Sequence, residues 1–120
     1  MGLDASLYRS PKKYANVPFI NPEDSFSDSE FEELHYWRQF WPLQYWMELL
    51  YSKKGGTKEF NCVNLQLTKE DLDQLEKDCK EFDTSQCLFG GRYAYELPLV
   101  IETARRVIDK GDCVFYWSWY

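Results

Sequence analysis

The chain has few of the residues from which zinc sites and Cys–His active sites are built. It contains one histidine, and its four cysteines (Cys62, Cys79, Cys87 and Cys113) form no Cys-x-x-Cys pair. A structural zinc site is therefore not expected. His35 lies among charged residues, where a surface role fits better than that of a catalytic base. With no nucleophile motif in view, we expect a protein without catalytic activity, cofactor or metal.

Long apolar runs and an excess of positive charge are absent as well. No run approaches the ~20 apolar residues of a membrane span, and the first residues lack the apolar segment of a signal peptide. These absences predict a cytoplasmic protein with reduced thiols. The 14 basic residues are outnumbered by 20 acidic ones, and the net charge of −6 argues against direct nucleic-acid binding.

Aromatic residues, by contrast, make up 18% of the chain. Disordered segments are poor in aromatics, so this composition predicts a folded protein. A length of 120 residues suits a single domain over 1–120, with a proline-rich loop at about residues 10–28. Five tryptophans are many for a core of this size, so some are expected at an interface.

The negative charge is concentrated in one segment. Between Asn21 and Leu34 there are six acidic residues and no Lys or Arg. The six are Glu23, Asp24, Asp28, Glu30, Glu32 and Glu33. Acidic side chains favour the positive end of the helix dipole, so the segment fits a solvated helix start. It also fits a docking patch for a basic partner, one that otherwise holds nucleic acid.

Alternating or aromatic-rich patterns predict three strands, over Leu3–Tyr8, Phe60–Leu67 and Cys113–Tyr120. Helical spacing predicts three helices. Their order along the chain is strand, helix, strand, helix, helix, strand. This order predicts an α+β fold, in which a small, mostly antiparallel sheet of about three strands packs against three helices.

The expected helix boundaries follow from N-cap residues and from prolines, which interrupt helices. The first helix is expected to start between Ser27 and Ser29, and Pro42 either kinks it or opens a new one. Thr68 is expected to cap the second helix. A loop over 83–93 should follow, and Pro98 fits the first turn of the third helix.

Two clusters of aromatic residues are candidates for partner contacts. The clusters are Tyr36 to Trp46 and Phe115 to Tyr120. Most rings of the first cluster fit the core better, but aromatic residues and arginine also dominate binding hot spots. Besides the six acidic residues, the predicted partner-binding residues are Tyr36, Trp37, Arg38, Trp46, Trp117 and Trp119. A self-associating structural component is a further alternative.

Several short motifs follow one another along the chain in a characteristic order. They are Met1-Gly2-Leu3-Asp4 with Leu7-Tyr8, then Tyr36-Trp37-Arg38 and Trp46, the segment 67–83, Phe89-Gly90 and the aromatic end 115–119. In this order they resemble a family of small phage and prophage proteins. The chain departs from the family at Gln44, where a histidine is common, and at Gly91-Arg92, which replaces Ser-Thr. The label phosphoglycerate kinase, sometimes given to the family, does not fit a chain too short for two nucleotide-handling lobes.

The resemblance implies a phage protein that acts in the cytoplasm of an infected bacterial host. With the composition, it favours a non-enzymatic binding protein that inhibits a host protein or ribonucleoprotein. An antiviral defence component such as a CRISPR-associated complex is the expected target class. The alternative is a protein that binds or sequesters a nucleotide-like ligand, in a pocket formed by Arg38, Gly90, Arg92 and Trp117.

Overall fold

A computed structural model of the chain describes residues 2–24 and 28–120. The strands are β1 (Asp4–Ser10), β2 (Phe19–Ile20), β3 (Glu32–Arg38), β4 (Asn64–Leu67) and β5 (Cys113–Trp119). The helices are α1 (Trp41–Lys53), α2 (Lys69–Asp78) and α3 (Gly90–Asp109), with short 3-10 turns at 12–14, 28–30 and 79–81. The α+β class is confirmed.

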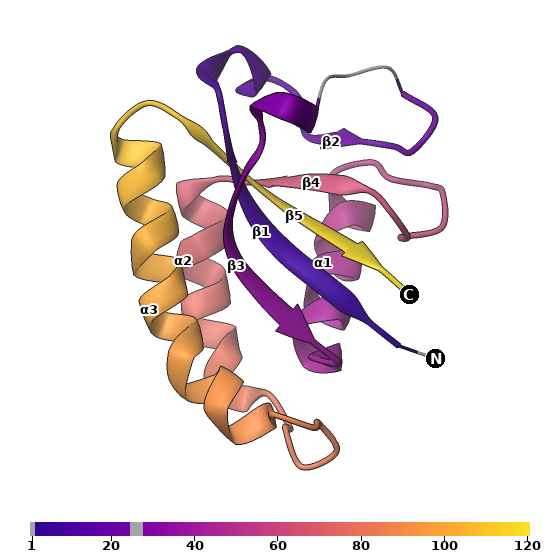
Figure 1. The fold of residues 1–120 in the computed structure, drawn as a ribbon, viewed down its shortest axis with the longest axis vertical. Helices are drawn as coiled ribbons and strands as arrows, with labels where there is room; N and C mark the ends of the chain where they lie inside the picture. The colour runs from indigo at the N-terminus through magenta and orange to yellow at the C-terminus, as the bar shows by residue number, and fades with distance from the viewer. Residues whose placement is uncertain (1, 25–27) are drawn as a thin grey trace.

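The five strands form one antiparallel sheet in the order β2-β4-β5-β1-β3 (Figure 1). The sheet is larger than the three strands that the sequence predicts. The strand β2 was missed because it has only two residues and lies in the proline-rich loop. The strand β3 was missed because its segment was assigned to a helix.

The segment before Pro42 is a strand because its apolar residues serve two different faces. Trp37 enters the main core, whereas Phe31 packs against a second cluster on the opposite side of the sheet. A register shift in the β1–β3 pairing places one extra residue, Leu34, between the pairs Leu7–His35 and Tyr8–Glu33. The bulge interrupts the alternation of inward and outward side chains that marks a strand. The apolar residues Phe31, Leu34 and Trp37 are then three positions apart, a spacing typical of a helix. Ser27, one of the expected caps, lies outside the described residues.

The three helices pack on one face of the sheet and share its core (Figure 1). Ala5, Leu7, Leu65, Val114 and Tyr116 point from the strands into this core. The central strand β5 is buried along most of its length, as its run of β-branched and aromatic residues predicts. The core therefore occupies one side of the sheet and leaves the other side for different contacts.

The predicted helix boundaries at Pro42 and Thr68 are confirmed. The helix expected to start between Ser27 and Ser29 does not form, since a 3-10 turn at 28–30 and the strand β3 stand there, and the boundary at Pro98 is also wrong. Pro42 lies in the first turn of α1. Thr68 caps α2, because its side chain accepts from the backbone N–H of Asp71 and the Asp71 side chain accepts from the Thr68 N–H. The helix α3 begins at Gly90, so Pro98 lies inside it and the loop ends earlier than expected. Burial of Tyr93 and residues at helical spacing beyond it favours the longer helix.

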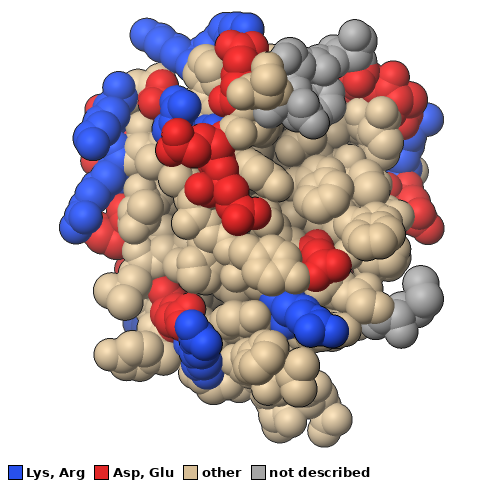
Figure 2. All heavy atoms as spheres, in the orientation of Figure 1, with Lys and Arg blue, Asp and Glu red and all other residues tan. Residues whose placement is uncertain are grey.

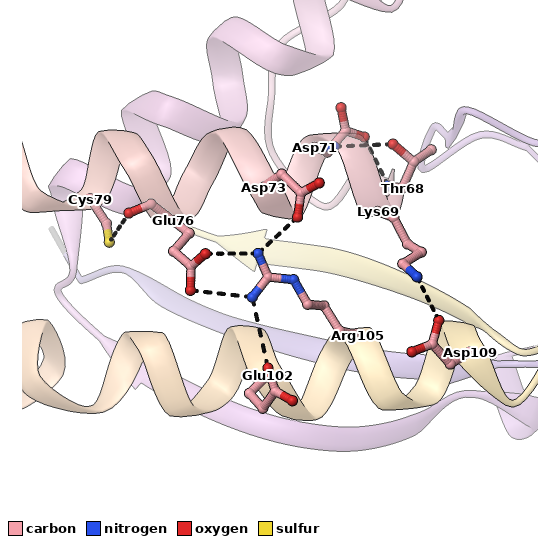
Figure 3. A network of polar contacts seen from close by, with 9 residues as sticks. All are labelled: Thr68, Lys69, Asp71, Asp73, Glu76, Cys79, Glu102, Arg105 and Asp109. Atoms are coloured by element: carbon pink, nitrogen blue, oxygen red, sulfur yellow. Dashed lines mark hydrogen bonds and ion pairs between the residues drawn. The ribbon is translucent and has the colours of Figure 1, made fainter.

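An ionic cluster joins α2 to α3 (Figure 3). Both terminal nitrogens of Arg105 donate to the carboxylate of Glu76, at 3.2 and 2.9 Å, and one also donates to Asp73 at 2.8 Å. Glu102 lies 3.8 Å away on the same helix as Arg105. The hydrogen bonds from Arg105 hold the pKa of Glu76 below its ordinary value of 4.5.

The Arg105 cluster should make stability depend on acid pH. Because the folded-state pKa of Glu76 is lowered, its contribution is complete above 4.5 and is lost as pH falls through the folded value. We expect Arg105→Ala to reduce the drop in stability between about pH 7 and about pH 3. Urea unfolding at both pH values measures this, with Arg106→Ala, an exposed neighbour, as the control. Equal acid sensitivity in both variants would contradict the prediction.

Candidate interaction surface

The face of the sheet opposite the helices is only partly covered. Near one end, Ile20, Cys113 and Phe115 are buried beneath Tyr14, Val17 and Phe31, which form a small second cluster. The other end carries alternate residues of three adjacent strands. We call this end the open sheet face, formed by Asp4, Ser6, Glu33, Tyr36, Arg38, Trp117 and Trp119. It lies where β1 begins and β5 ends, side by side (Figure 1).

Strand register sets the arrangement of the open sheet face. Ser6 on β1 pairs with Trp117 on β5 and with Tyr36 on β3. One step along, Asp4 pairs with Trp119 and with Arg38. Paired residues on adjacent strands have Cβ atoms ~5 Å apart, so these side chains form one contiguous surface.

Hydrogen bonds fix the polar groups of this face. The Tyr36 hydroxyl donates to Oδ1 of Asp4, and this bond raises the pKa of Tyr36. The Ser6 hydroxyl donates to Oε2 of Glu33 at 2.7 Å. Both carboxylates are thus held in place beside the aromatic rings.

Two large rings on the open sheet face are accessible. Trp119 is 56% exposed and Tyr36 is 44% exposed. Trp117, two residues before Trp119 on β5, is half-buried. Figure 2 shows this side of the molecule as a mostly uncharged surface with acidic and basic groups set within it. Contiguous aromatic surface with a few fixed polar groups is typical of protein interfaces.

The other predicted aromatic contacts lie elsewhere. Trp37 is 1% exposed and belongs to the main core. Trp46 is half-buried on α1, and its indole N–H donates to Asp78 at 2.9 Å, which ties α1 to α2. The structure therefore places four of the six named aromatic and arginine residues on one face, and these two away from it.

The acidic segment is not a separate, unneutralised patch. Glu23 pairs with Lys58 at 3.1 Å, Glu30 with Lys13 at 2.5 Å, and Glu32 with Arg9 at 3.8 Å. The Asp24 carboxylate accepts from the backbone N–H of Asn21, and the side chain of Asp28 lies outside the described part of the structure. These are surface pairs and weak ones, but they reduce the local negative charge. The expected helix start does not form over Glu32 and Glu33, which lie in β3.

The residues of the alternative ligand pocket are divided between two places. Arg38 and Trp117 belong to the open sheet face, whereas Gly90 and Arg92 lie in the first turn of α3. Arg92 pairs with Glu96 at 2.7 Å. Gly90 is packed so closely that an added Cβ would lie 2.4 Å from the Thr84 carbonyl oxygen. Gly90 therefore serves a close backbone contact.

The four cysteine thiols are not activated as nucleophiles. Burial raises the pKa of Cys62, Cys79, Cys87 and Cys113, so each thiol is protonated at neutral pH. His35 is partly buried, with its Nε2 atom 3.6 Å from Glu96 and its ring 4.9 Å from Trp37. Burial lowers the pKa of His35, which favours the neutral ring.

No family model, curated protein or solved structure matches this chain. Within residues 2–24 and 28–120, no helix is long and apolar enough to cross a membrane. In the same residues, no three side chains of His, Cys, Asp or Glu are grouped to hold a metal ion. Any function therefore has to be inferred from the surfaces of the molecule.

Sequence reasoning missed the parts of the open sheet face that depend on pairing. Ser6 carries no signal of its own, and it matters only because it is the small residue between Trp117 and Tyr36. Asp4 was noticed for its place in the opening motif and not for its bond to Tyr36. Assigning 32–38 to a strand would have placed Tyr36 and Arg38 on one face by alternation.

Proposed function

We propose that the chain is a non-catalytic binding protein that contacts a protein partner through the open sheet face. The observation that carries this is the exposure of Trp119 and Tyr36 beside fixed carboxylates, on a sheet whose other face is fully used by the helices. Aromatic rings supply most of the contact energy in such interfaces, and nearby charges set orientation.

The proposed role is inhibition of a host factor by a phage protein. It rests on the resemblance to phage proteins and on the acidic, aromatic surface. A host antiviral protein or ribonucleoprotein, such as a CRISPR-associated complex, is the proposed target class. The carboxylates of Asp4 and Glu33 on the open sheet face would complement basic groups on the target.

A variant carrying Tyr36→Ala and Trp119→Ala is expected to lose the partner. Tagged wild type should recover one stoichiometric partner from bacterial lysate, and the double variant should recover at least tenfold less, since hot-spot truncations cost about 2 kcal/mol or more. Quantitative mass spectrometry measures the recovery. The matched control is Leu49→Ala with Tyr95→Ala, two exposed apolar side chains on helices. Equal recovery by both variants, or no stoichiometric partner, would refute the proposal.

Binding of a nucleotide-like ligand is the alternative, and a separate measurement distinguishes it. Thermal unfolding with a panel of nucleotides should leave the midpoint unchanged if the partner is a protein. A large, saturable rise that is lost in Arg38→Ala would favour the nucleotide instead.

A further inference from the structure

A groove lies between the start of α1 and the segment that leads into α3. Its volume is about 490 Å³, within the range of small-molecule sites. The residues that line it are Trp41, Pro42, Tyr45, Glu81, Phe82, Asp83, Gln86 and Cys87. We call it the α1 groove.

The aromatic walls of the α1 groove are held in position by contacts with one another and with residues outside the groove. The Trp41 indole N–H donates to the Gln39 side chain at 3.1 Å, and its ring lies 6.0 Å from that of Tyr120. Tyr45 packs against Trp41 with ring centroids 5.7 Å apart. Phe82 packs edge-on against the buried Phe40. A ligand would therefore meet preformed ring surfaces.

The charge of the groove has one sign. Glu81 and Asp83 are among its lining residues, and none of the eight is basic. Oδ1 of Asp83 accepts from the backbone N–H of Ser85 at 3.0 Å and from the Ser85 hydroxyl at 2.7 Å. These bonds lower the pKa of Asp83, so its carboxylate is ionised at neutral pH.

Aromatic faces and carboxylates together select one class of ligand. Anions are repelled by the two carboxylates, and a neutral apolar molecule gains nothing from them. A cation on an apolar body uses both features, because ring faces attract cations and the carboxylates attract the same charge.

We propose that the α1 groove binds a small organic cation, an alkylated ammonium group carried on an apolar body. The site is distinct from the open sheet face and does not depend on the proposed function. We choose this class of ligand because its positive charge complements the carboxylates and its apolar part complements the aromatic rings.

Choline and its neutral isostere 3,3-dimethylbutan-1-ol test the proposal on the purified chain. The two have the same shape and differ in charge. We expect choline to shift the indole N–H resonance of Trp41 saturably, and the neutral alcohol to bind about tenfold more weakly. A Trp41→Phe sample assigns the resonance. No saturable shift up to tens of millimolar choline, or equal binding of the alcohol, would overturn the proposal.

Charge-neutral variants locate the site. Glu81→Gln with Asp83→Asn should weaken choline binding about tenfold, whereas Asp24→Asn with Glu70→Gln, outside the groove, should leave it unchanged. Each variant is first checked by thermal unfolding, so that loss of folding is not mistaken for loss of binding. An equal effect of both pairs would mean that choline responds only to net charge, and the groove would not be its site.

Discussion

Replacing Trp37 with alanine is expected to lower the free energy of unfolding by about 3–5 kcal/mol. The indole is 1% exposed, and its ring lies 6.5 Å from Phe40 and 6.3 Å from Tyr116. Removing it takes apolar contact from both and leaves a cavity between the edge strand β3 and the helices. Domains of this kind have a total stability of about 5–15 kcal/mol, so the loss is a large part of it.

Trp119→Ala is the matched control for Trp37→Ala. It removes the same side chain from an exposed position on the open sheet face, where truncation changes stability by about 0.5 kcal/mol or less. Urea unfolding followed by circular dichroism measures both. Similar losses for the two variants would contradict the division of tryptophans into core and surface.

Removing either half of the Tyr116–Gln44 hydrogen bond should destabilise the fold by about 1–3 kcal/mol. The fully buried hydroxyl of Tyr116 donates to Oε1 of Gln44 at 2.7 Å, and the Gln44 amide reaches the Phe60 carbonyl at 3.5 Å. Tyr116→Phe leaves Oε1 of Gln44 without this donor, and Gln44→Leu leaves the hydroxyl without its acceptor. A buried polar atom without a hydrogen-bond partner destabilises the folded state, because nothing offsets its loss of hydration.

The double variant Tyr116→Phe with Gln44→Leu is expected to lose less stability than the sum of the two single losses. It removes both members of the pair, so only the Phe60 carbonyl loses a weak donor. Because burial raises the pKa of Tyr116, the hydroxyl stays protonated and the coupling should not change between about pH 6 and about pH 9. Chemical unfolding of all four proteins gives the coupling free energy. Strict additivity would show that the bond contributes nothing.

Local chemistry made some elements predictable from sequence. The reciprocal bonds of Thr68 and Asp71 involve residues three apart, so the start of α2 is encoded within one turn. The strand β5 is similarly easy to predict, because six of the eight residues over 113–120 are β-branched or aromatic, a composition that favours a strand. In both cases the residues that carry the signal are the ones that form the structure.

The open sheet face was less predictable because strand pairing creates it. Tyr36, Arg38, Trp117 and Trp119 were named from their residue types, but nothing local says that 36–38 and 117–119 lie on either side of β1. The bulge at Leu34 removed the alternation that would have identified β3. Long-range register is the information that a single sequence lacks.

The position of β5 has a consequence for how the chain acquires its structure. Of the described strands it is made last, yet it lies at the centre of the sheet, between β4 and β1. Until the ribosome has released it, the nascent chain can form only two unconnected strand pairs, β2 with β4 and β1 with β3. Contacts between residues 4 and 119 can close only after all the residues between them have been made, so folding of this sheet should be late, cooperative and slow. A chaperone that binds the nascent chain would therefore bind it before the central strand β5 has been made.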